Sequence, residues 1–172
     1  MKGKCVIVMG VSGCGKSTIA EAIAKEMNAV FLEGDDFHSQ SNIDKMKAGI
    51  PLTDDDRKGW LENIHTKITT DTDKGEDSIL SCSALKRKYR DTLRKDMAHI
   101  LFIYLKGSFE LIHGWMEKRK HHFMPPELLK SQFDTLEEPT AEEKDAITVH
   151  IDAGIQSEIQ HILQQLKKRN YL

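Results

Sequence analysis

Three glycines, a lysine and three hydroxyl residues follow the first apolar run of the chain within nine positions. The run ends in G-V-S-G-C-G-K-S-T, in which Gly10, Gly15, Lys16 and Ser17 match the spacing G-x-x-x-x-G-K-[ST]. Glycines in such a loop let successive backbone N–H groups turn towards an anion, and the helix that follows adds the positive end of its dipole. The segment therefore predicts a loop that holds the phosphates of a nucleoside triphosphate, with Lys16 at the β- and γ-phosphates and Ser17 as a ligand of Mg²⁺.

The predicted phosphate-binding loop also contains a cysteine. The residues assigned to nucleotide binding in this loop are Gly10, Ser12, Gly13, Cys14, Gly15, Lys16, Ser17 and Thr18. Cys14 is either a small residue that fills a variable position or a thiol that responds to oxidants, and its place in the pattern favours the filler. A glycine turn that merely joins a strand to a helix is the alternative for the whole loop, and the complete motif in its strand–loop–helix setting argues against it.

Length and charge narrow the class of protein. The chain has 172 residues, a net charge of -2 and 30% charged residues, which fits one domain and gives no general attraction to nucleic acid or to an acidic membrane. The longest apolar runs fall far short of the roughly 20 residues that span a bilayer. Three cysteines without a C-x-x-C pair are typical of a reducing compartment. We therefore expect a cytoplasmic protein with no nucleic-acid or membrane partner.

Apolar runs alternate with helical patterns along the chain. The runs predict strands at 5–9, 30–32, 79–82, 100–105 and 147–151, and apolar residues at helical spacing lie between them and after the last. Thr53 and Asp56 form a capping-box pattern at the start of the longest helix. This alternation predicts an α/β fold with a five-stranded parallel sheet covered on both faces, and ligands in such sheets bind beyond the carboxyl ends of the strands.

One long segment interrupts the alternation. Residues from about 120 to 143 contain three of the four prolines and show little periodicity. A loop of that length inside a compact domain is usually functional. We expect a single domain over residues 1–172 with a lid inserted at about 120–143.

Six blocks of sequence, in order, resemble the gluconate kinase family. They are the phosphate loop, LEGDDFH, PLTDDDRKGWL, CSALKRKYRDTLR, FIYLKGSFELI and HFMPPELLKSQFDTLEEP, spread over about residues 6 to 139. Members of this family are ATP-dependent sugar-acid kinases with the three-layer αβα P-loop fold of nucleoside monophosphate kinases, and they are related to shikimate kinase. The resemblance implies phosphorylation of D-gluconate to 6-phospho-D-gluconate with ATP and Mg²⁺, by a protein that forms dimers.

The block LEGDDFH follows the second predicted strand and supplies acids and a histidine. The resemblance implies that Asp35 orients the acceptor hydroxyl and takes its proton, and that Glu33 contacts Mg²⁺ through water. The alternative for Asp35, and more so for Asp36, is a solvated acid or a helix cap. His38 either binds a substrate hydroxyl or caps the next helix.

Gluconate carries a carboxylate, so its pocket needs fixed cations. Arg57 and Lys86 are the candidates, since each follows a loop or a strand, and Arg binds carboxylates in a bidentate manner. Arg90 lies one helical turn after Lys86 on the same face and is included with them. For Arg87 and Lys88 we favour the alternative, a solvated helix face.

The residues before the expected lid offer a cation and an aromatic ring. The resemblance implies that Arg119 closes over the phosphates, where it neutralises charge on the transferred group. The family usually has Arg where Trp115 stands, and an indole there either stacks on adenine or packs in the core. His121 and His122 lack nearby Cys or acid partners, so we reject a zinc site.

Two rival functions differ in class. One is a kinase of the same build that acts on shikimate or a nucleotide, and the blocks EGDDFH and DDDRKGWL argue against it. The other is a non-catalytic nucleotide-binding switch, against which Asp35 and the basic residues before the lid argue. The sequence therefore favours a gluconate kinase.

Overall fold

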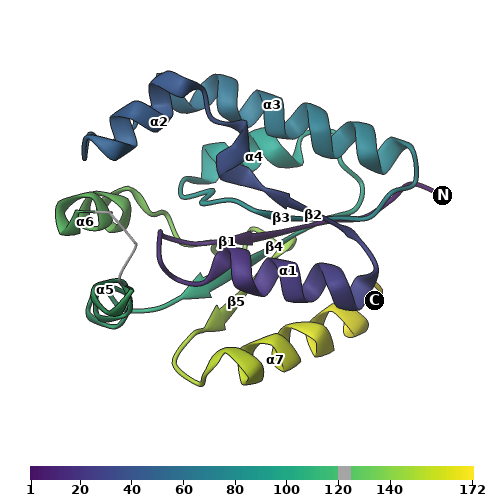
Figure 1. Cartoon of the computed structure of the whole chain (residues 1–172). Coiled ribbons are helices and arrows are strands. Elements are labelled where there is room, and N and C mark those ends of the chain that lie inside the picture. The colour runs from purple at the N-terminus through teal and green to yellow at the C-terminus, as the bar shows by residue number, and fades with distance from the viewer. Residues whose placement is uncertain (120–124) are drawn as a thin grey trace.

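Five short strands form one parallel sheet in the computed structural model of the chain, which describes residues 1–119 and 125–172 (Figure 1). The strand order is β2-β3-β1-β4-β5, and every neighbouring pair is parallel. The strands are β1 (Cys5–Met9), β2 (Val30–Glu33), β3 (Ser78–Ser81), β4 (Ile100–Lys106) and β5 (Ala146–His150). The predicted α/β fold with a five-stranded parallel sheet is confirmed, and each predicted strand limit lies within one residue of the observed one.

The central strand explains why the first apolar run has no polar alternation. All five residues of β1 are fully buried, because β3 and β4 flank the strand and helices cover both of its faces. At its carboxyl end Val8 lies opposite Ser81 of β3. The chain after β1 stays close to the chain after β3, since the amide of Gly10 donates to the carbonyl of Ser83 at 3.3 Å. Polar residues that follow these two strands are thereby brought to one edge of the sheet.

Helices cover both faces of the sheet and one end of it (Figure 1). On one face, α1 (Lys16–Met27) and α7 (Ile155–Lys168) pack on the sheet, and α3 (Asp54–Asp73) and α4 (Arg87–Arg94) pack on the other. The short helix η1 (Gly34–Phe37) and α2 (Gln40–Lys47) follow β2, while α5 (Phe109–Lys118) and α6 (Pro126–Thr135) lie beyond the end of the sheet. Each face has its own apolar core, one centred on Val6 and Val8 and the other on Ile7 and Met9.

The longest helix begins with the predicted capping box. The Thr53 hydroxyl accepts a hydrogen bond from the Asp56 amide at 3.1 Å, and the Asp56 carboxylate accepts one from the Thr53 amide at 2.9 Å. The acidic first turn also faces the positive end of the helix dipole. This start fixes the first turn of α3, which carries Arg57.

The segment expected to be irregular contains a helix. Pro126 is the first residue of α6, where proline costs nothing because that amide has no partner inside the helix, and Leu128 and Leu129 are buried. The proline-rich composition was therefore misleading for residues 126–135. His121 and His122, and with them the start of the expected lid, lie outside the described residues.

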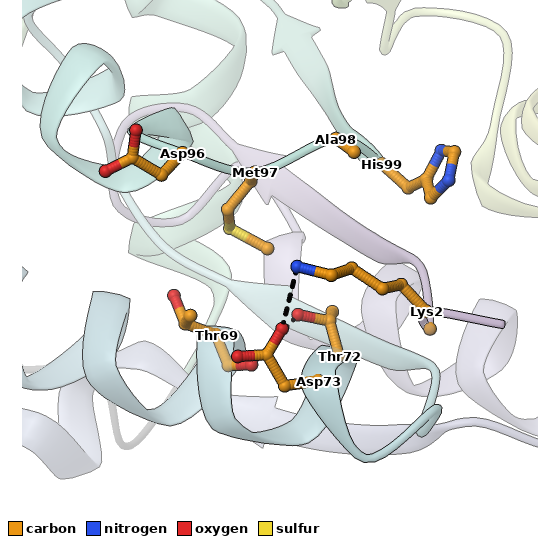
Figure 2. Close-up of a pocket in the computed structure, with 9 residues that line it drawn as sticks. Lys2, Thr69, Thr72, Asp73, Asp96, Met97, Ala98 and His99 are labelled. Atoms are coloured by element: carbon orange, nitrogen blue, oxygen red, sulfur yellow. Dashed lines mark hydrogen bonds and ion pairs between the residues drawn. The ribbon is translucent and has the colours of Figure 1, made fainter.

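A small cavity lies at the end of the sheet opposite the phosphate loop, where β1 and β4 begin. Figure 2 shows Lys2, Thr69, Asp73 and Met97 around it, with the Lys2 ammonium 3.0 Å from the Asp73 carboxylate. The cavity measures about 10 Å³, which barely holds one water molecule. In the described part of the chain, no helix is both long enough and apolar enough to cross a membrane.

Candidate active site

The phosphate loop joins β1 to α1 in the backbone conformation that its glycines allow. Gly13 and Gly15 have φ values of +80° and +93°, and a Cβ on Gly13 would lie 2.7 Å from Cγ of Met116. Gly15 is the residue before α1, and among the described residues no side chain caps the first amides of that helix. The Lys16 ammonium donates to the carbonyl of Val11 at 3.0 Å, which folds it over the loop. The loop thus offers backbone amides, a helix N-terminus and a lysine to an anion.

A pocket of about 140 Å³ opens beside the phosphate loop, at the carboxyl ends of β1, β2 and β3. Residues from all three connections line it, with others from α3 and α6. The polar lining relevant to the chemistry consists of Ser12, Lys16, Glu33, Asp35, His38 and Arg57. The pocket therefore brings together six of the residues that the sequence singled out.

Glu33 ends β2 between two hydroxyl groups. The Ser17 hydroxyl donates to its carboxylate at 2.6 Å, and the Ser81 hydroxyl donates to the other oxygen. Carboxylate and hydroxyl oxygens at the mouth of a phosphate loop are donors of the kind that Mg²⁺ prefers. In the part of the chain described, no cluster of three or more His, Cys, Asp or Glu suited to a metal occurs.

The two neighbouring aspartates of η1 lie in different surroundings. Asp35 lines the pocket, whereas Asp36 lies in a shallow depression with Asn63 and Thr66 of α3. Gly34 makes this arrangement feasible, because a Cβ there would lie 2.2 Å from the Ser81 carbonyl oxygen. The tight contact between the end of β2 and β3 turns Asp35 towards the phosphate loop.

His38 is a neutral hydrogen-bonding group. Its ring stacks on Trp60 with centroids 4.2 Å apart, and the Trp60 indole N–H donates to the Gly34 carbonyl at 2.8 Å. Burial, together with the charge of Arg57, lowers the pKa of His38 to about 4. The imidazole is therefore uncharged at neutral pH. It can exchange hydrogen bonds with a hydroxyl group but does not act as a cation.

Arg57 and Lys86 are connected through a tyrosine and an aspartate. Arg57 Nη1 donates to the Leu52 carbonyl at 2.7 Å and to the Tyr89 hydroxyl at 3.2 Å. The Tyr89 hydroxyl donates in turn to Asp54, which also pairs with Lys86 at 3.1 Å. Arg57 lines the pocket, and Lys86 lies behind it, outside the lining. Burial raises the pKa of Tyr89 to about 12, so the phenol keeps its proton in this network.

Arg90 does not reach the pocket, contrary to the expectation from sequence. Its side chain is fully buried, and it donates to Glu143 from Nε at 2.8 Å and from Nη2 at 2.7 Å. Nη1 donates to the carbonyls of Ala84 at 2.9 Å and Leu85 at 3.3 Å. Arg90 follows Lys86 at helical spacing, but Lys86 is the residue before α4 and pairs with Asp54. The two side chains therefore do not share a helix face. Arg90 holds the β3–α4 connection, in which Ala84 has a positive φ of 44°.

A second pocket, of about 190 Å³, lies on the other side of the phosphate loop. Cys14, Gly15 and Thr18 form one wall, and Trp115 and Arg119 of the α5 end form another. The remaining lining comes from the start of α7, at Gly154, Ile155 and Glu158. Trp115 is half-buried and Arg119 is exposed. An indole beside the phosphate loop suits a flat aromatic base.

Cys14 behaves as a filler of the loop. Its side chain is 2% exposed, and burial raises the pKa of its thiol. A buried thiol that keeps its proton is a poor nucleophile towards oxidants. The geometry therefore agrees with the filler interpretation.

Gln132 and Ser81 were not predicted from the sequence. The Ser12 amide donates to the side-chain oxygen of Gln132 at 2.7 Å, which joins α6 to the phosphate loop. Ser81 stands at the end of β3 in the run S-C-S. A hydroxyl at a strand end was the available signal for Ser81, whereas Gln132 carried none because α6 itself was not expected.

Comparison with known proteins gives consistent matches over most of the chain. Residues 5–139 match the family model described as AAA domain. The thermosensitive gluconokinase of Escherichia coli is 46% identical over 90% of this chain and 83% of its own length, and the thermoresistant gluconokinase of the same organism is 42% identical over 94% and 93%. The crystal structure of a gluconokinase from Sinorhizobium meliloti is 41% identical, covers 97% of this chain and 93% of its own, and superimposes with a TM-score of 0.88.

Proposed function

The chain belongs to the gluconokinase family, and we propose from this premise that its site transfers the terminal phosphoryl group of ATP to D-gluconate, giving ADP and 6-phospho-D-gluconate. One geometric observation supports the proposal. A single pocket has the phosphate-loop lysine, Lys16, on one wall and a carboxylate and a guanidinium, Asp35 and Arg57, on others. The reaction needs a group that binds the phosphates of ATP, a proton acceptor and a cation that binds the carboxylate of the acceptor, and these three residues supply them.

On the donor side, catalysis rests on positioning and charge. The amides from Gly10 to Thr18 hold the phosphates, and Lys16 leaves the Val11 carbonyl to meet the terminal phosphoryl group. Arg119 neutralises charge on the same group from the end of α5. Trp115 stacks on adenine in the second pocket, where its indole takes the place of the arginine usual in the family.

On the acceptor side, Arg57 binds the gluconate carboxylate and His38 exchanges hydrogen bonds with a hydroxyl. Asp35 accepts the proton of the attacking gluconate hydroxyl. At the same time the hydroxyl oxygen bonds to phosphorus, and the bond from phosphorus to the ADP oxygen breaks. Lys86 lies behind Arg57 and supports its position through the Asp54–Tyr89 link. The acids, cations and imidazole of this wall thus have separate tasks.

Mg²⁺ belongs to this proposal as the partner of ATP. Ser17 would hold it directly and Glu33 through water, and the 2.6 Å hydrogen bond between these side chains shows that their oxygens converge. When bound, Mg²⁺ supplies positive charge to the phosphate oxygens. The remaining work of alignment and proton transfer falls to the residues named above.

The setting of the enzyme is a further part of the proposal. We expect a cytoplasmic homodimer with a lid at about 120–143 and no nucleic-acid or membrane partner. The three cysteines are buried free thiols, which supports a reducing compartment. Light scattering on the purified protein tests the dimer, and a monomer at micromolar concentration would contradict it.

An ADP-release assay over a panel of acceptors tests the function. We expect turnover with D-gluconate and little with shikimate or nucleoside monophosphates, while the other sugar acids of the panel measure selectivity within that class. Lys16→Ala is the control, because it should abolish transfer while leaving the fold intact. Preferred turnover of shikimate or a nucleotide would overturn the substrate, and ATP binding without ADP release on any acceptor would indicate a switch.

A further inference from the structure

Gln132 of α6 is hydrogen bonded to Ser12 of the phosphate loop through both atoms of its amide. The Ser12 backbone N–H donates to Oε1 at 2.7 Å, and Nε2 donates to the Ser12 hydroxyl at 3.1 Å, across a separation of 120 positions. A backbone N–H can only donate, so the atom opposite it must be the amide oxygen, and this fixes the orientation of the side chain. The contact is therefore specific for both the amide and the hydroxyl of one residue.

Ser12 stands at the acceptor end of the phosphate loop. It lines the pocket that contains Lys16 and Asp35, whereas Cys14 and Gly15 line the pocket of Trp115 on the other side. A nucleotide whose base lies against Trp115 must extend its phosphates past Gly15 towards Ser12. The terminal phosphoryl group and its acceptor therefore meet beside the Ser12–Gln132 contact.

We propose that Gln132 is a positioning residue for the phosphoryl transfer, acting through Ser12. It keeps the acceptor end of the phosphate loop in one conformation, and the same helix places Leu128 and Ser131 in the wall of the acceptor pocket. The acceptor wall and the phosphate loop are thus joined by a direct contact. This inference rests on the proposed function, since it needs a phosphoryl group that passes from ATP to an acceptor beside Ser12.

A neutral amide is the side chain that this position requires. Glutamate has the same shape, and its two oxygens can still accept hydrogen bonds from the Ser12 amide and hydroxyl. It would, however, bring a negative charge next to the terminal phosphoryl group of ATP. A purely structural contact would tolerate glutamate, whereas a contact at the terminal phosphoryl group would not.

Gln132→Glu and Gln132→Ala test the proposal, with Lys130→Gln as the matched control on the same helix. Lys130 forms an exposed pair with Asp134 and does not line the pocket. Calorimetry measures the affinity for ATP and ADP, steady-state assays give kcat and KM, and thermal unfolding reports the fold. For Gln132→Glu we expect ATP affinity to fall on the order of tenfold more than ADP affinity. The reason is that only ATP carries the negatively charged γ-phosphoryl group next to residue 132. For Gln132→Ala we expect kcat to fall on the order of tenfold with ADP affinity retained.

Two results would overturn the inference. One is a wild-type ratio of ATP to ADP affinity in Gln132→Glu. The other is a Gln132→Ala variant that loses thermal stability but keeps kcat per folded molecule. The affinity ratio is measured without an acceptor, so it tests Gln132 even if the wild-type protein fails to phosphorylate gluconate. Failure of the proposed function is thereby distinguished from failure of this inference.

Discussion

Arg90 and Glu143 form a bidentate ion pair in which both side chains are almost completely buried. The guanidinium and carboxylate are joined by bonds of 2.8 and 2.7 Å, and the exposed fractions of the two side chains are 0% and 2%. Burial alone would raise the pKa of Glu143, but hydrogen bonds from Arg90 and Arg94 hold it at about 2. The pair ties α4 to the chain that leads into β5, and its role is structural.

Arg90→Ala should therefore destabilise the protein strongly. Removing one partner leaves a buried charge without compensation, which typically costs about 3–5 kcal/mol. Denaturant unfolding measures the loss. KM for gluconate in the folded fraction should stay near the wild-type value, because Arg90 does not line the pocket.

Arg87→Ala is the control for this prediction. Arg87 pairs with Glu142 at the surface, where ion pairs contribute about 0–1 kcal/mol. A small loss for Arg90→Ala combined with a large rise in KM for gluconate would contradict the structural role. Such a result would show that Arg90 contributes to binding of the acceptor.

Asp35→Asn should lower kcat on the order of 10²-fold, because the amide cannot accept the hydroxyl proton. ATP affinity should change much less, since the substitution preserves size and shape. Asp36→Asn is the matched control, because Asp36 lies outside the pocket beside α3. A larger loss of kcat for Asp36→Asn than for Asp35→Asn would show that the proton acceptor is the other neighbour.

Local patterns were sufficient to predict the sheet and the phosphate loop. The strands of a doubly covered parallel sheet are continuous apolar runs, and the loop between β1 and α1 has a strict spacing, so both were visible without tertiary information. The direction of side chains could not be predicted from local patterns. Lys86 and Arg90 lie one helical turn apart in sequence, but only Arg90 belongs to α4. Its burial depends on Glu143, which is 53 positions away. The Ser12–Gln132 contact likewise depends on packing between distant elements.

Arg57→Ala should raise KM for gluconate more than KM for ATP. The guanidinium lines the acceptor pocket and can bind a carboxylate through two parallel hydrogen bonds, a loss of about 1.5–3 kcal/mol or roughly 10- to 100-fold in KM. Arg57→Lys should recover only part of the affinity, because lysine is a point charge. Steady-state kinetics with each substrate varied in turn separate the two effects. A selective loss of ATP affinity would place Arg57 on the donor side.

The pH dependence of stability should reveal His38. The pKa of its imidazole is about 4 in the folded protein and 6.5 in the reference state, so the unfolded chain binds more protons between these values. The contribution of His38 to the free energy of unfolding should therefore fall as the pH drops from 6.5 to about 4. Urea unfolding of the wild type and of His38→Gln across this range measures the difference. Parallel curves for the two proteins would show that the imidazole titrates normally.

Trp115 offers the most direct test of the nucleotide pocket. In a Trp60→Phe background its fluorescence should change when ADP is added, because the indole is half-buried beside the phosphate loop. Trp115→Phe should keep most of the affinity, while Trp115→Ala should weaken ATP and ADP binding alike by about 1–3 kcal/mol, as for base stacking on aromatic side chains. Equal losses are expected because the phosphate contacts remain. If Trp115→Ala instead lowers the melting temperature and leaves nucleotide affinity per folded molecule unchanged, the indole serves the core and adenine binds elsewhere.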